Sequence, residues 1–212
     1  MAQARRQQRK QRSADGAFAL YLSRGLREGG FLLAAAMAAY LVISLASYHA
    51  SDPGWSYSGG LGPIANRGGV IGAWIADIFL YLFGYFAYLF PLAVAWSGWL
   101  TFHGRSLPSG SADWSFLAGR GAGFLLTLAS GCGLATLHFY GAGLPLNAGG
   151  ILGDVVGGGL AGVMSPLGAT LLLLAVFLGS RPLMTGVSWL TVIDTTGRVT
   201  LEGVAWVRWT AS

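Results

Sequence analysis

Two acids in apolar surroundings are the residues of this chain best suited to chemistry. Asp77 lies in a long apolar segment, and Asp154 lies in a glycine-rich stretch. If these segments cross a membrane, a carboxylate at membrane depth is a candidate for moving ions or protons, or for pairing with a cation. The structural alternative, which we favour, is that both acids lie near the membrane surface. Asp77 would then pair with Arg67 or with backbone at the start of a helix.

Nucleotide-binding motifs are the next possibility, and the sequence argues against them. Lys10 is the only lysine, and it lies outside any glycine-rich loop, whereas a P-loop needs its lysine on the phosphates. Residues 157–162 have the spacing G-x-G-x-x-G, but no strand pattern precedes them. No acidic residue follows about twenty positions later, as a dinucleotide fold requires. Helix packing is the better interpretation of these glycines, and no cofactor-binding residue is expected.

Metal binding and nucleophilic catalysis have no better support. His49, His103 and His138 lack the short spacings of zinc sites. Cys132 is the only cysteine, which excludes an internal disulfide and a site built from several thiolates. In an apolar segment this cysteine fits a packed small residue better than a nucleophile. We therefore expect no metal and no catalytic residue.

The elements that carry these residues are strongly apolar. Charged residues make up 10% of the 212 and apolar residues 54%, whereas charged residues reach about 25% in typical soluble domains. A soluble fold could not cover its surface with so few charges. Because helices satisfy their own backbone hydrogen bonds in lipid, the composition predicts an all-α polytopic membrane protein.

Four apolar segments are long enough to cross a bilayer, for which about 20 residues suffice: residues 30–48, 70–102, 121–140 and 166–184. The second is longer than a bilayer needs, so its start is expected to project or tilt, and Pro91 is expected to kink it. Asn66 is expected to cap the start of this helix.

The glycine-rich stretch 141–165 is predicted to form a short re-entrant or interfacial helix on the outer side, not a fifth span. Twelve of the thirteen Lys and Arg residues then fall on one side, with Arg67 the exception. Positive charge near spans stays in the cytoplasm, so both termini are predicted to be cytoplasmic. A fifth span would move three C-terminal arginines outside.

Three regions follow from this pattern. Residues 1–15 are basic and rich in Gln, and they are expected to be a disordered tail. Residues 16–195 form the predicted membrane domain, and residues 196–212 begin a cytoplasmic linker. The tryptophans and apolar residues after the fourth span suggest a segment lying at the membrane interface.

Several blocks of sequence carry a family resemblance. SDPGWS at residues 51–56 follows the first span, and NRGGVIGAWIAD occupies residues 66–77. FGYFAY follows at 83–88, then GGILG at 149–153 and TGVSWL at 185–190. In this order, over about residues 30–195, the blocks resemble the N-terminal four-span membrane domain of the FtsK/SpoIIIE family of bacterial DNA translocases.

The resemblance implies a membrane anchor and assembly domain at the division septum of the bacterial inner membrane. Such a domain tethers a cytoplasmic ATP-driven motor that pumps DNA in cell division and chromosome segregation. ATP and Mg would belong to that motor, which this chain lacks, and DNA would be contacted only through it. The implied partners are the lipid bilayer, further copies in a hexameric homo-oligomer, and other cell-division membrane proteins. The alternative is a small ion channel or transporter that uses Asp77 and Asp154.

The residues expected to support assembly and helix contacts come from the blocks of the resemblance and from a stripe of glycines spaced by four. They are Asp52, Trp55, Asn66, Gly68, Gly69, Trp74, Asp77, Pro91, Gly149, Gly153, Gly157 and Trp189.

Overall fold

The computed structural model describes residues 2–58, 62–103, 111–185 and 188–210, and in these residues it contains helices and connecting segments but no strand. Four stretches are long and apolar enough to cross a membrane: Arg24–Ala46, Gly69–Phe102, Leu117–His138 and Gly150–Met184. The predicted all-α membrane protein with four spans is confirmed. The chain forms two compact units, Met1–Phe79 with Ala87–Leu107, and Leu80–Phe86 with Pro108–Ser212.

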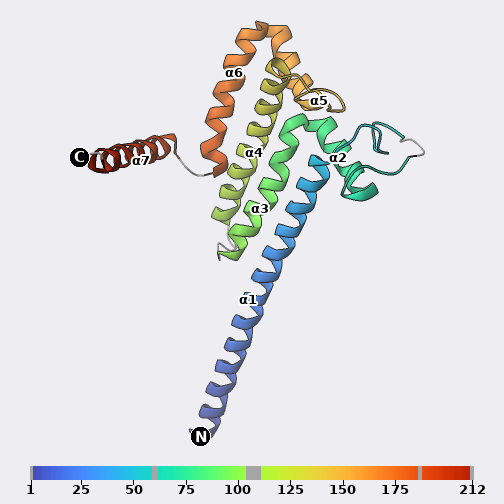
Figure 1. Ribbon diagram of the computed structural model, residues 1–212. Coiled ribbons are helices and arrows are strands. Elements are labelled where there is room, and N and C mark those ends of the chain that lie inside the picture. Colours follow the sequence, from blue (N-terminus) through green and yellow to red (C-terminus); the bar gives the residue numbers. More distant parts are fainter. Residues whose placement is uncertain (1, 59–61, 104–110, 186–187, 211–212) are drawn as a thin grey trace. The chain divides into compact units, whose positions relative to one another are not determined.

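Of the helical elements, Figure 1 labels the α-helices. In chain order the helical elements are α1 (Ala2–Ala46), α2 (Gly69–Phe83), the 3₁₀ segment η1 (Gly84–Tyr88), α3 (Leu89–Phe102), α4 (Ser111–His138), α5 (Gly150–Gly153), the π-helical segment η2 (Asp154–Gly158), α6 (Gly159–Thr185) and α7 (Trp189–Thr210).

Helical order extends further at both ends than the sequence analysis expects. Residues 2–15, expected to be disordered, form the first turns of α1, and most of the expected linker 196–212 belongs to α7. Ala, Arg, Gln and Lys are good helix formers. Adding turns to an existing helix is far easier than nucleating a new one, so the apolar span can extend into the basic segment.

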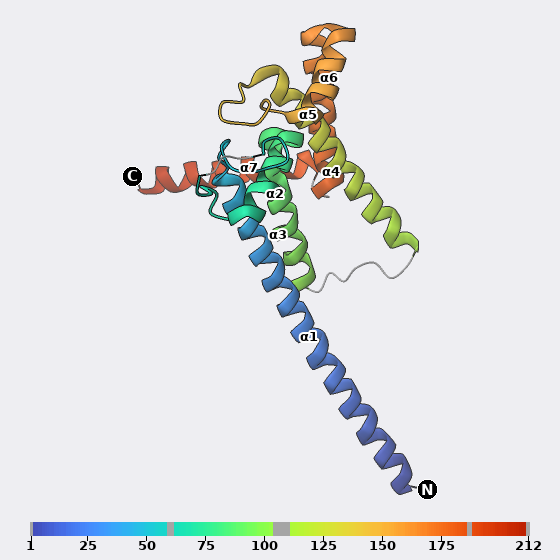
Figure 2. The same ribbon diagram turned by 90° about the vertical axis from the view of Figure 1, so that its right-hand side faces the viewer.

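In the first unit, α1 and α3 lie side by side (Figures 1 and 2). The side of α1 that is shielded from solvent includes Ala34 and Ala38, at helical spacing. A Cβ added to Gly98 of α3 would lie 2.6 Å from the Cβ of Ala34. The rings of Phe31 and Phe102 have centroids 5.2 Å apart. Small residues thus let the two backbones approach closely, as is common between helices in membranes.

The second span is not one straight helix. Gly84 has φ of +54°, a conformation that glycine adopts without steric cost, and the 3₁₀ segment η1 starts there. Phe79 and Phe90 have ring centroids 4.7 Å apart, whereas a straight helix would advance about 16 Å between them. The helix axis must therefore turn sharply between α2 and α3.

The expected kink at Pro91 is wrong. Pro91 is the third residue of α3, in the first turn, where backbone N–H groups have no partner within the helix. A proline in this turn removes no hydrogen bond of the helix, so the break is made by Gly84 instead.

In the second unit, α4 and α6 pack antiparallel (Figures 1 and 2). The hydroxyls of Thr127 and Ser180 share a hydrogen bond of 2.7 Å. Eleven residues further along α4, Nε2 of His138 lies 2.8 Å from Oγ1 of Thr170. The partner's number falls along α6 as the number rises along α4, which defines the antiparallel pairing.

The glycine stripe of Gly149, Gly153 and Gly157 faces α4 within this unit, and all three residues are buried. A Cβ on Gly153 would lie 2.5 Å from the carbonyl oxygen of Cys132, and a Cβ on Gly157 would lie 2.5 Å from that of Gly133. These residues therefore bring two backbones into direct contact.

A break in α6 falls one residue before Pro166, the predicted start of the fourth span. Ser165 has φ of 75° and interrupts α6. Its Oγ accepts a hydrogen bond of 3.4 Å from the N–H of Gly168. This is N-cap geometry, followed by proline at the first helical position. The residues from Gly150 to Met164 thus form a short helical segment before this break, and its predicted place at the outer membrane surface stays a prediction.

The glycine contact predicts opposite effects of one methyl group at two positions of the short helix. Gly153→Ala should lower the free energy of unfolding by about 1–3 kcal/mol, because its Cβ overlaps the backbone of α4. Gly162→Ala is the control, since no atom lies within 4 Å of its added Cβ, and better helix propensity should make it neutral or stabilising by up to about 1 kcal/mol. Thermal unfolding of purified protein in detergent measures both. Equal melting temperatures for the two variants would contradict this packing.

Candidate functional site

Asp52 fastens the loop between α1 and α2. Its Oδ1 accepts a hydrogen bond from the N–H of Ala65, and its Oδ2 accepts one from the N–H of Asn66, each at 2.8 Å. The side chain is 7% exposed. Hydrogen bonds to an ionised carboxylate are stronger than those between neutral groups. The start and the end of the loop are therefore held together by one buried acid.

Asn66 caps α1 instead of α2. Its Nδ2 donates to the carbonyl oxygen of Ser44, in the last turn of α1, at 2.8 Å. The last carbonyls of a helix have no partner within the helix, so Asn66 satisfies one of them. Its Oδ1 accepts from the N–H of Gly68 at 2.8 Å, which lies just before α2. The expected role as N-cap of the second helix is thus corrected.

Asp77 attaches the loop to α2. It is 3% exposed. Its Oδ2 accepts from the N–H of Ser56 at 2.6 Å, and its Oδ1 accepts from the Ser56 hydroxyl at 2.7 Å. A Cβ on Gly54 would lie 2.5 Å from Asp77 Oδ2, so glycine is needed for this approach. The acid thus bonds to loop residue Ser56, and not to Arg67 or to backbone at a helix start, as the sequence analysis considered.

Tyr48 lies beside both carboxylates, two residues beyond the end of α1. Burial raises the pKa of its hydroxyl from 10.0 to about 12, and the negative charges of Asp77 and Asp52 add to the rise. The folded state therefore favours the protonated phenol. The stability gained is fully present below pH 10 and is lost as the pH rises through about 12, so Tyr48 stays neutral at physiological pH.

Gly68 and Gly69 lie where the start of α2 meets the end of α1. A Cβ on Gly68 would lie 2.9 Å from the Cα of Gly72, and Gly69 has φ of +69°. The Tyr40 hydroxyl of α1 donates to the carbonyl oxygen of Gly68 at 2.9 Å. Gly68 thus leaves room for Ser44 and Tyr40 of α1 next to the start of α2, and Gly69 supplies the positive φ at which α2 begins.

The remaining residues singled out from the sequence do not join this cluster. Trp55 and Trp74 are 57% and 44% exposed, as suits aromatic residues at a membrane interface. Pro91 is buried within α3. Trp189 begins α7, and its side chain lies outside the described residues.

A second polar cluster, in the other unit, is organised by Asn147. Its Oδ1 accepts from the N–H of Gly149 at 3.0 Å and from the Thr136 hydroxyl at 3.3 Å. Its Nδ2 donates to Oδ1 of Asp154, an exposed residue, at 2.7 Å. Sequence reasoning missed Asn147, as it missed Ser56. Both are short polar residues in turn-rich segments, where such side chains often form hydrogen bonds with nearby backbone groups. This pattern could have identified them in the sequence.

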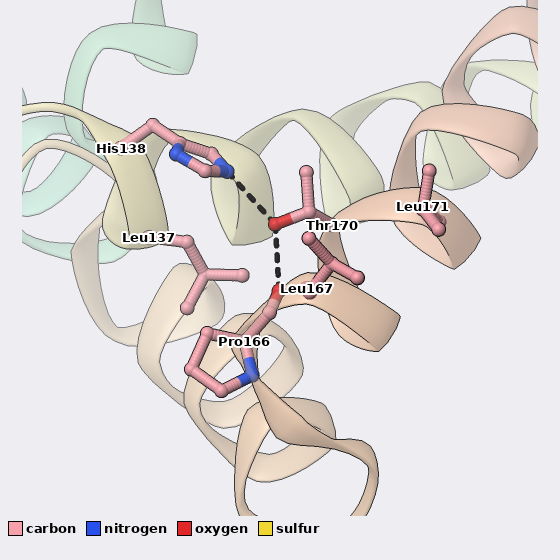
Figure 3. A pocket seen from close by; sticks show the side chains of 6 residues that line it. All are labelled: Leu137, His138, Pro166, Leu167, Thr170 and Leu171. Atoms are coloured by element: carbon pink, nitrogen blue, oxygen red, sulfur yellow. Dashed lines mark hydrogen bonds between the residues drawn. The ribbon is translucent and has the colours of Figure 1, made fainter.

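A pocket of about 380 Å³ lies in the second unit between the end of α4 and the start of the fourth span (Figure 3). It is lined by Leu137, His138, Pro166, Leu167, Thr170 and Leu171. The Thr170 hydroxyl donates to the carbonyl oxygen of Pro166 at 2.7 Å. Its oxygen also lies 2.8 Å from Nε2 of His138, with which it shares a hydrogen bond. The two polar side chains of the wall bond to each other, and the rest of the lining is apolar.

These arrangements hold helices and loops together. Cys132 is buried, and its thiol donates to the carbonyl oxygen of Phe83 at 3.4 Å. Within the described residues, no three or more His, Cys, Asp or Glu side chains gather as a metal site would require.

The chain resembles a known protein family over most of its length. The family model for the 4TM region of DNA translocase FtsK/SpoIIIE matches residues 23–197. A DNA translocase FtsK of Shewanella oneidensis is 44% identical over 177 residues, which cover 83% of this chain and 19% of the relative. One of Pseudomonas syringae pv. tomato is 39% identical over 194 residues, covering 88% and 24%. One of Vibrio vulnificus is 33% identical over 181 residues, covering 85% and 18%.

The chain thus spans about a fifth to a quarter of the length of these relatives. No solved structure matches it significantly. The family match includes all four apolar spans, the loop held by Asp52 and Asp77, and the glycine stripe. The chain therefore belongs to the family of the 4TM region of the FtsK/SpoIIIE DNA translocases.

Proposed function

We propose that this chain is the membrane anchor and assembly domain of a DNA translocase at the division septum of the bacterial inner membrane. It tethers an ATP-driven DNA-pumping motor in cell division and chromosome segregation. The observation that carries the proposal is the family match over residues 23–197, which coincides with the four spans. In this proposal ATP, Mg and DNA are bound by the motor, in the larger part of such proteins outside the matched region.

The mechanical logic is direct. A motor that pulls DNA needs a fixed point against which the pull is exerted, and several apolar helices in a bilayer provide one. Copies held in one membrane also raise the local concentration of motors, which favours a ring, proposed here as a hexamer. Other cell-division membrane proteins are the proposed partners that place the ring at the septum.

The bonding of the acids supports an anchor over a channel or transporter. Both oxygens of Asp77 are occupied by Ser56, and Asp154 is bonded to Asn147. A carboxylate that binds a transported ion must exchange its partners. These acids are instead fixed by residues of their own unit.

Replacing Asp77 or Asp154 with asparagine distinguishes an anchor from a channel or transporter. In Asp77→Asn, Oδ1 still accepts from the Ser56 N–H and the new NH₂ donates to the Ser56 hydroxyl, so both hydrogen bonds lose the carboxylate charge, at a cost of about 1–3 kcal/mol. We expect a lower melting temperature and faster proteolysis of the loop at residues 47–68 in detergent. Asp154→Asn is the matched control, because its remaining oxygen still accepts from Asn147, and it should behave like the wild type. Ion flux through wild-type proteoliposomes that Asp77→Asn abolishes would instead support a channel.

A domain exchange tests the role at the septum. In a full-length translocase carrying this chain and a fluorescent tag, we expect a fluorescent band at midcell. Replacing residues 1–197 with an unrelated four-span domain of the same orientation keeps the motor in the membrane, and it should spread the fluorescence over the whole cell envelope. A midcell band in the exchanged protein would show that this chain does not direct localisation.

A further inference from the structure

The helix α7 leaves one apolar face uncovered. Each α7 side chain that the structure describes is exposed, including Ile193 and Val199 at 63% each. Leu201 is 72% exposed. No other described part of the chain therefore covers these residues. Their apolar side chains must contact lipid, another protein or water.

The apolar side chains that the structure describes in α7 lie toward one side of the helix. At about 100° per residue, this side holds Ile193 and Val199, with Leu201 at its edge. The opposite side collects Thr191, Asp194, Thr195, Arg198 and Glu202. Thr196 and Thr200 lie between Ile193 and Val199 and interrupt the apolar side. Such a helix, with one strongly polar face, is of the kind that lies in a membrane interface.

The chain connection places α7 next to the bilayer. The fourth span reaches Met184, α6 ends at Thr185 and α7 begins at Trp189. Four residue steps extend at most about 14 Å. The first turn of α7 therefore cannot leave the neighbourhood of the membrane surface at which the span ends.

The charges of α7 show what kind of attraction is available. Asp194 and Glu202 balance Arg198 and Arg208, so the helix has no net charge. Attraction to anionic headgroups needs an excess of Lys or Arg. Binding of this helix to a membrane would therefore depend on its apolar face and not on lipid charge.

We propose that α7 lies along the membrane surface, with the face of Ile193 and Val199 in the boundary between headgroups and acyl chains, and the face of Arg198 and Glu202 in water. The occupant of the uncovered apolar face is the lipid bilayer. The 22 residues of α7 then run about 33 Å along the surface. This inference does not depend on a motor or on septal targeting, since a free bilayer is enough.

Spin-label accessibility in lipid nanodiscs tests the proposal on the full chain. Single cysteines replace Ile193, Val199, Arg198 or Glu202 in a Cys132→Ser background, and each carries a nitroxide label. We expect high collision rates with oxygen and low rates with a water-soluble nickel chelate at 193 and 199, and the reverse at 198 and 202. The pattern should be the same in neutral phosphatidylcholine and in discs that contain phosphatidylglycerol.

A second substitution guards against a label that perturbs the helix. Val199→Asp places a charge on the apolar face and should raise nickel accessibility at 193, while the melting temperature of the spans stays unchanged. Equal nickel accessibility at all four positions would show a helix in water and overturn the proposal. Exclusion of both reagents from 193 and 199 would show a protein partner or second copy there, and a requirement for anionic lipid would show electrostatic binding; either result would also overturn it.

Discussion

At three described places where a helix ends or breaks, backbone groups find their hydrogen-bond partners within the protein. A backbone group that loses water and finds no partner costs as much as a lost hydrogen bond, and lipid offers none. Asp52 accepts from two successive N–H groups at the end of the first loop. Asn66 satisfies a carbonyl in the last turn of α1. At the break of the second span, the N–H of Tyr85 donates to the carbonyl oxygen of Ala148 at 2.9 Å.

This constraint also explains where glycine is indispensable. A Cβ on Gly84 would overlap the carbonyl of Ala148, which is the same group that accepts from Tyr85. The hydrogen bond from Tyr85 to Ala148 therefore depends on glycine at position 84, because a side chain there would keep the two backbone segments apart. Gly153 acts in the same way against the backbone of α4. Close backbone contact also replaces the hydrophobic driving force that helices lack in lipid.

The sequence predicts features that depend on composition and local spacing. The four spans follow from length and apolarity, and the start at Pro166 follows from a local rule for helix beginnings. The break at Gly84 could not be predicted, because nothing local distinguishes it from glycines that only pack. The partner of Asn66 was assigned to the wrong helix, since Ser44 lies 22 positions away. The pairing of Ser56 with Asp77 crosses 21 positions, and such contacts depend on the folded path of the chain.

A domain that anchors a motor, as we propose for this chain, must resist sliding of its helices, and the contacts between α4 and α6 would oppose such sliding. Apolar surfaces alone fix axial register poorly, because one turn of leucines resembles the next. The bonds from Thr127 to Ser180 and from His138 to Thr170 lie eleven residues apart on α4, a distance of about 16 Å along the helix. Hydrogen bonds between membrane helices average only about 0.6 kcal/mol, so these two contribute little to overall stability. Their value lies in register, since sliding of α6 along α4 would break both at once.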